Sequence, residues 1–153
     1  MSQTTVIAPV VKVLNVRCPV EDAFRVFTRE ISTWWPTETH AVHDGDVREV
    51  VWEEREGGEV YEVSTSGEKA HWATVTAWEP SSRFVLAWYV NPERPAPTEV
   101  EVRFSPEGET TRVELEHRHW ERLAEAGADA RAAYDEGWDP VLGRFAERAA
   151  SVV

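Results

Sequence analysis

The sequence predicts an α+β domain in which a curved antiparallel sheet wraps around a C-terminal helix. Apolar and polar residues alternate over several short segments between residues 47 and 119, as they do on strands with one buried face. Short Gly- and Pro-containing stretches separate these segments, which favours antiparallel pairing. After Trp120 the apolar period becomes helical. The residues on the apolar face of that helix are Tyr134, Trp138, Val141, Leu142 and Phe145.

The N-terminal part is expected to supply one strand and two short helices. Residues Thr5–Arg17 alternate loosely and are rich in Val, which predicts the first strand. Pro19 suits the first turn of a helix, and apolar residues then recur at helical spacing up to Phe27. A second apolar cluster at residues 31–35 predicts the second short helix, which Pro36 ends.

Six further strands are expected to complete a seven-stranded sheet. In one of them Val100, Val102 and Phe104 share a side and Glu99 and Glu101 take the other, so one face of the sheet is buried and one is wet. The expected strands are Val47–Glu54, Glu59–Ser64, Lys69–Trp78, Arg83–Val90, Thr98–Ser105 and Thr110–His119, with the Pro-rich stretch Pro92 to Pro97 as one of the turns.

The final helix must cover the apolar face of this sheet. Gly137 and Pro140 lie within its apolar repeat, and a proline cannot donate a hydrogen bond to the carbonyl of Glu136. A kink at Pro140, or the start of the most regular helical section there, is therefore expected.

Length and composition favour one cytoplasmic domain. The 153 residues contain no repeat or Gly/Ser linker, so residues 1–153 are expected to form a single core. Cys18 is the sole cysteine, which excludes an intramolecular disulfide and fits a reducing compartment. The segment Met1–Pro9 lacks a signal-peptide pattern, and no stretch approaches the roughly 20 apolar residues of a membrane span. Export and membrane insertion are not expected.

Charge and aromatic content point toward a small-molecule partner. Lys and Arg number 16 against 28 Asp and Glu, giving a net charge of −12, and the basic residues are scattered. Such a surface is a poor partner for nucleic acid or anionic membranes, so neither is expected. Eight tryptophans are more than a core of this size usually needs, and an aromatic-lined cavity would use them.

The chain resembles the SRPBCC (START-like) superfamily, in the branch similar to the activator of heat-shock-protein ATPase. The segments that carry the resemblance are AFRVFTREISTWWP (23–36), EEREGGEVYEV (53–63), ATVTAWEPSSRFVLAW (73–88), TEVEVRFSPEGETTRVELEHRHWERL (98–123) and YDEGWDPVLGRF (134–145). The resemblance implies a helix-grip fold, in which a seven-stranded antiparallel sheet holds the last helix over a hydrophobic tunnel.

The resemblance does not carry the family's namesake activity to this chain. Stimulation of the chaperone's ATPase involves an additional N-terminal domain, which no residues before the first strand supply, so a chaperone partner is not expected. Small single-domain members look more like stand-alone ligand binders. The scarcity of Lys beside Arg suggests a bacterial source with a GC-rich genome.

An aromatic and aliphatic set is expected to line the cavity between sheet and helix, with a filled core as the alternative for each member. The candidates are Trp72, Trp78, Phe84, Leu86, Trp88, Phe104, Leu115, His117, Tyr134, Trp138 and Phe145. His117 follows the inward parity of Leu115 and is the expected polar contact, and a satisfied core histidine is the alternative reading. Thr74 and Thr76 share parity with Trp72 and could add hydroxyls.

The sequence gives little support for a metal site, a phosphate-binding loop or a catalytic nucleophile. His40, His43, Asp44 and Asp46 form an acidic loop with a metal-like look, but no second ligand cluster accompanies them, so no metal is expected. No phosphate-binding loop, nucleophile elbow or inward carboxylate pair is visible, because most strand acids take the solvent parity, and no cofactor is expected.

The sequence thus favours a binding module for a small apolar or aromatic molecule, with sequestration or self-protection as the role. A cavity enzyme of cyclase, dehydratase or hydrolase type, using a buried His117, is the alternative from a different class. A protein that assists a chaperone through an exposed apolar patch is a third. A homodimer is a possible assembly.

Overall fold

The computed structural model describes residues 7–89 and 97–152. The elements in order are β1 (Val10–Val16), α1 (Val20–Phe27), the 3-10 helix η1 (Ile31–Thr33), β2 (Val47–Trp52), β3 (Glu59–Ser64), β4 (Lys69–Glu79), β5 (Arg83–Trp88), β6 (Thr98–Glu107), β7 (Thr110–Arg118), the 3-10 helix η2 (Trp120–Ala126) and α2 (Gly127–Ser151). The predicted succession of one strand, two short helices, six strands and a final helix is confirmed.

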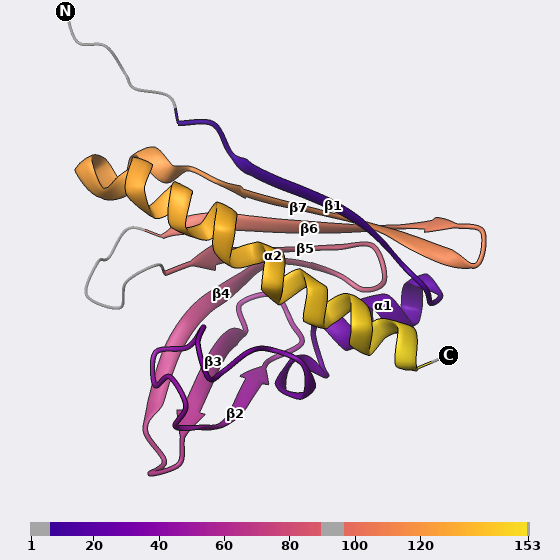
Figure 1. Cartoon of the computed structure of the whole chain (residues 1–153), viewed down its shortest axis with the longest axis horizontal. Coiled ribbons are helices and arrows are strands. Elements are labelled where there is room, and N and C mark those ends of the chain that lie inside the picture. Colours follow the sequence, from indigo (N-terminus) through magenta and orange to yellow (C-terminus); the bar gives the residue numbers. More distant parts are fainter. Residues whose placement is uncertain (1–6, 90–96, 153) are drawn as a thin grey trace, which may run out of the picture.

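One antiparallel sheet holds all seven strands, in the order β1-β7-β6-β5-β4-β3-β2. Consecutive strands are neighbours except β1, which joins the far edge beside β7, with Val10 opposite His117. Figure 1 shows the sheet curling so that β2 and β3 bend away from the plane of β6 and β7, while α2 crosses the concave side. This is the helix-grip arrangement that the sequence predicts.

The element boundaries differ from expectation mainly at the last helix. The chain after β7 first forms η2, and α2 begins only at Gly127. From there α2 continues through Pro140, so no helical section begins at the proline. Pro140 is exposed, and the lost hydrogen bond is offset because Trp138 and Val141 on either side are buried against the sheet. The expected strand residues 5, 6 and 90 and turn residues 92–96 lie outside the described residues.

Two β-bulges in β4 break its alternation. Against β3, Val60 pairs with Ala73 and Tyr61 with His71, so Trp72 is an extra residue between the two pairs. Against β5, a second register shift leaves another β4 residue without a direct partner. Bulges of this kind bend a strand and redirect its side chains.

The bulges decide which β4 side chains point inward. The Trp72 ring lies 4.9 Å from that of Trp35, and the Trp78 ring lies 5.0 Å from that of Phe24, so both tryptophans face the interior. Thr74 is only half-buried and Thr76 is exposed. The grouping of these threonines with the tryptophans is therefore wrong, because strict alternation does not survive a bulge.

The end of the interior nearest α1 is filled by phenylalanines. Phe27 of α1 lies 4.8 Å from Phe145 of α2, and 5.4 Å from Phe84 of β5, between ring centres. Phe24 lies 5.1 Å from Phe104 of β6. These rings are at most 5% exposed and leave the opposite end of α2 as the place where a cavity can remain.

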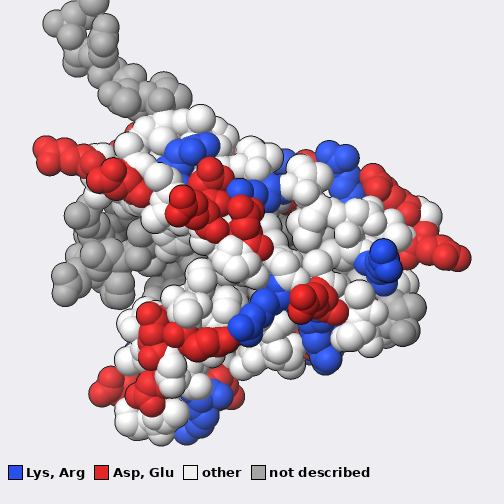
Figure 2. Space-filling model, viewed as in Figure 1, with Lys and Arg blue, Asp and Glu red and all other residues white. Residues whose placement is uncertain are grey.

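The surface carries interspersed charges of both signs. On the face shown in Figure 2, Lys and Arg lie among Asp and Glu and form no continuous basic stripe. Lys12, for example, contacts Asp135 at 2.9 Å and Asp139 at 3.0 Å on α2. In residues 7–89 and 97–152, no helix is long and apolar enough to cross a membrane.

Candidate ligand-binding site

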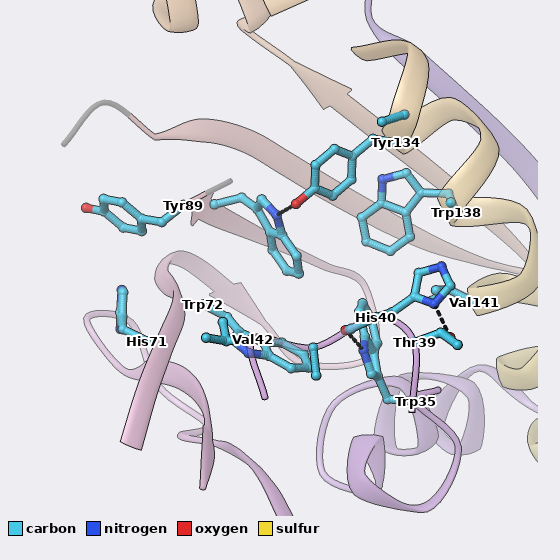
Figure 3. A pocket seen from close by; sticks show the side chains of 14 residues that line it. Trp35, Thr39, His40, Val42, His71, Trp72, Tyr89, Tyr134, Trp138 and Val141 are labelled. Carbon is cyan, nitrogen blue, oxygen red and sulfur yellow. Dashed lines mark hydrogen bonds between the residues drawn. The ribbon is translucent and has the colours of Figure 1, made fainter. Parts of the chain in front are cut away.

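A cavity of about 430 Å³ lies between α2, the segment 35–42 and the neighbouring ends of β4 and β5 (Figure 3). Its volume is in the range of small-molecule sites. The lining residues are Trp35, Thr39, His40, Ala41, Val42, His71, Trp72, Trp88, Tyr89, Ala133, Tyr134, Gly137, Trp138 and Val141. Among these described lining residues there is no Asp, Glu, Lys or Arg.

Four tryptophans dominate the lining, and each indole N–H is already hydrogen-bonded within the protein. The acceptors are the His40 carbonyl for Trp35 at 2.7 Å, a Glu62 carboxylate oxygen for Trp72 at 2.7 Å, the Tyr134 hydroxyl for Trp88 at 3.0 Å and His117 Nδ1 for Trp138 at 3.1 Å. An indole N–H can donate only one bond. The four rings therefore present carbon faces and edges to the cavity.

Glu62 holds two walls of the cavity together. Its side chain lies on β3 and is 0% exposed. One oxygen accepts bonds from the Val42 amide at 2.6 Å and the Trp72 indole at 2.7 Å, and the other from the His43 amide and His43 Nδ1, both at 2.8 Å. Four donors satisfy a carboxylate that burial would otherwise penalise. Glu62 thereby fixes both the segment around Val42 and the Trp72 ring.

The hydrogen bond to Glu62 also changes the pKa of His43. The bond to Glu62 raises the pKa of His43 above its usual 6.5, and the nearby Glu68 adds to the effect at 3.4 Å. A protonated His43 donates one N–H to each carboxylate, which strengthens the attachment of the loop to the sheet.

His117 lies beside the cavity but does not line it. Because the Trp138 indole can only donate, His117 Nδ1 must accept, and Nε2 carries the hydrogen. This Nε2–H faces the Thr98 hydroxyl at 2.7 Å, and that hydroxyl donates onward to the Trp88 carbonyl at 3.2 Å. The ring is 0% exposed, and burial lowers the pKa of His117 to about 3. The geometry is that of a satisfied, neutral core histidine.

Sequence reasoning and the structure agree on part of the lining. Trp72, Trp88, Tyr134 and Trp138 lie in the cavity wall. The other predicted residues are in the interior outside this lining. Those residues are Trp78, Phe84, Leu86, Phe104, Leu115, His117 and Phe145. The α1 phenylalanines pack against the aromatic members of this group, and Trp120 packs against its histidine.

Several lining residues were not predicted. The segment 39–42 had no periodic pattern, and its position depends on Glu62, a long-range contact. Trp35 was assigned to the second short helix without a role, although its size was a usable signal. Glu62 itself shares parity with the buried Val60, which indicates an inward carboxylate. His71 and Tyr89 come to the rim at 5.1 Å from each other because of the β4 bulge.

The acidic loop with the metal-like sequence is organised by protein contacts. His43 binds Glu62, His40 Nδ1 lies 2.7 Å from the Thr39 hydroxyl, Asp44 accepts the Ala41 amide at 2.9 Å, and Asp46 contacts Thr65. Within the described residues no three His, Cys, Asp or Glu side chains are grouped for a metal ion. The absence of a metal stays a prediction.

Replacing Glu62 by Gln should weaken the attachment of the loop. The amide has one acceptor oxygen where the carboxylate has two, so at least one of the four donors would face another donor. We expect the free energy of unfolding to fall by about 1.5–3 kcal/mol, measured by urea denaturation. Glu68→Gln is the matched control, because Glu68 is 73% exposed and should change stability little. An equal effect of the two changes would contradict the account.

The protonation of the histidines gives a second test. Because burial lowers the pKa of His117 to about 3, its unfolded form binds a proton more readily, so its stabilising contribution is complete above about pH 6.5 and falls as the pH drops toward 3. NMR at about pH 5 should show His117 as the neutral Nε2–H form and His43 protonated. Titration of His117 near its usual 6.5 would show that the ring is not buried as described.

Several proteins of known structure are similar to this chain. The synthase Txn09, an anthrahydroquino-γ-pyrone synthase, is 29% identical over 97% of this chain and 98% of that chain, with a TM-score of 0.63. The self-sacrificing resistance protein CalC from Micromonospora echinospora is 25% identical over 93% and 94%, with a TM-score of 0.71. The Aha1 dimer from Colwellia psychrerythraea, at 14% identity over 94% and 97%, shares the fold with a TM-score of 0.68.

No match was found among curated protein sequences. The family model described as Activator of Hsp90 ATPase homolog 1-like protein, in contrast, matches residues 17–150, which include every element from α1 to α2 except the last helical residue. The chain therefore belongs to the Activator of Hsp90 ATPase homolog 1-like family.

Proposed function

We propose that the protein binds a small, flat aromatic molecule in the cavity between α2 and the sheet. The observation that carries the proposal is the set of four indoles around about 430 Å³, each with its N–H bonded inside the protein. Such walls offer a guest large apolar contact and no indole donor to satisfy. A stacked or edge-on aromatic guest would gain more than area burial alone provides.

The similar proteins support this ligand class and suggest a role. An anthrahydroquino-γ-pyrone, the product named for Txn09, is a fused and flat aromatic system of the kind these walls suit. CalC is named as a self-sacrificing resistance protein, which supports protection against a toxic compound as the purpose of binding. A cytoplasmic protein that takes up such a compound would lower its free concentration in the cell.

A catalytic role is the second candidate, because the 29% identical relative is a synthase. His117, the catalyst that the sequence suggested, lies outside the lining. Burial lowers its pKa to about 3, which makes it poorly suited to acid–base catalysis near neutral pH. His71 is better placed, because it lines the cavity and its Nδ1 lies 3.1 Å from a Glu59 carboxylate oxygen. That contact would orient the ring as a base if a substrate replaced the Thr74 hydroxyl, which lies 3.3 Å from Nε2. Conversion of a bound compound, followed by mass spectrometry, would favour this role.

Partnership with other macromolecules has weaker support. A homodimer remains a proposal, since the Aha1 dimer shares the fold alone with this chain. The mixed charges around α2 support the expectation that nucleic acid is not a partner. We do not propose a chaperone as a partner.

Filling the cavity should weaken binding without harming the fold. Ala133 lines the cavity from α2, while its neighbour Ala132 does not, and both are exposed. With fluorene as the probe, we expect about one site per chain by calorimetry, quenched tryptophan emission and a raised melting temperature. Ala133→Phe should weaken the affinity at least about tenfold, and Ala132→Phe should change it by less than about twofold.

Both variants should melt close to the wild type, because exposed helix positions tolerate a phenylalanine. If fluorene binds the wild type and both variants equally, the site lies elsewhere on the protein. If the wild type binds no fluorene, the cavity does not take a flat aromatic guest.

A further inference from the structure

Few polar groups in the cavity are free to meet a ligand. The four indole N–H groups are bonded within the protein, and the lining residues of the described ranges include no Lys or Arg. Thr39 and His40 Nδ1 bond to each other at 2.7 Å. His71 uses Nδ1 toward Glu59 at 3.1 Å and Nε2 toward Thr74 at 3.3 Å. Apart from His40 Nε2, each of these side-chain groups has an internal partner among the described residues, which leaves that ring nitrogen and the two phenols as groups that could meet a ligand.

The Tyr134 hydroxyl keeps its proton available for a ligand. Its oxygen accepts the Trp88 indole N–H at 3.0 Å, and no acceptor in the described part of the chain receives its own O–H. A phenol can donate one bond while it accepts another. Burial raises the pKa of Tyr134, so the proton stays on the oxygen at neutral pH. The bond accepted from Trp88 also polarises the hydroxyl and makes it a stronger donor.

The position of Tyr134 suits recognition of a ring substituent. Figure 3 shows Tyr134 between Trp138 and Tyr89, and its hydroxyl accepts the bond from the Trp88 indole. Its ring is 6.4 Å from the rings of both Trp88 and Trp138. A flat guest held against these indoles would place its edge, where substituents project, near the phenol oxygen.

We infer that the ligand carries a carbonyl oxygen on its aromatic system and that the Tyr134 hydroxyl donates a hydrogen bond to it. This inference rests on the proposed function and narrows it to neutral polycyclic ketones and quinones. An anionic acceptor such as a carboxylate is disfavoured, because no Lys or Arg is among the lining residues that the structure describes and the protein carries a net charge of −12.

Fluorenone and fluorene test the inference because they share the flat tricyclic frame and differ at the carbonyl. Calorimetric titration of each compound into wild type and Tyr134→Phe separates the hydrogen bond from the ring contacts. We expect the variant to weaken fluorenone by about 3- to 10-fold, the effect of one lost hydrogen bond, and to change fluorene by less than about twofold. Tyr89→Phe, which removes the other lining phenol, tests the alternative donor, and Tyr61→Phe, whose phenol lies on β3 outside the lining, is the control that should change neither compound by more than about twofold.

The outcomes separate the inference from the function it rests on. If Tyr134→Phe leaves fluorenone unaffected, or weakens both compounds equally, Tyr134 contributes packing only and the inference is wrong, while binding of flat aromatics stands. If Tyr89→Phe alone weakens fluorenone, the donor is misassigned and the inference is again wrong. If the wild type binds neither compound, the proposed function fails and the inference fails with it.

Discussion

The cavity depends on one buried carboxylate. Glu62 is 0% exposed, and removing such a charge from water is costly unless donors replace the lost hydration. Its four donors come from Val42, His43 and Trp72, so satisfying the charge obliges the loop before β2 and the β4 bulge to meet at β3. The walls they form face α2, and the position of the cavity follows from the electrostatic need of Glu62.

The interior is divided into a filled end and an open end. At the filled end α1 inserts Phe24 and Phe27 between the sheet and Phe145, and the packing is that of an ordinary core. At the other end α2 meets indoles whose N–H groups are each tied to a protein acceptor, which fixes the ring orientations without a ligand. A pre-formed aromatic site loses little entropy when a rigid guest enters, and this favours tight binding of flat molecules.

Periodicity predicted the elements, the family resemblance implied their helix-grip arrangement, and the site was predictable only where periodicity holds. The alternation in β6 and β7 and the helical repeat of α2 correctly assign their inner faces, including His117 and Trp138. In β4 the bulge at Trp72 defeats alternation, and nothing local in the sequence marks it. Whether an inward residue meets a cavity or a neighbour depends on long-range packing, which is why Phe84 and His117 were grouped with Trp88. The loop residues His40 and Val42 reach the site through Glu62, a contact across 20 residues that pattern cannot reveal.

The central claim is that an aromatic guest occupies the space between α2 and the four indoles. Intermolecular nuclear Overhauser effects from bound fluorene locate the guest directly. The account predicts contacts to the methyl groups of Val42, Val141 and Ala133, which line the cavity. Contacts instead to Val11 and Val13, the exposed valines of β1 at 54% and 51%, would place the guest on the outer surface and contradict the account.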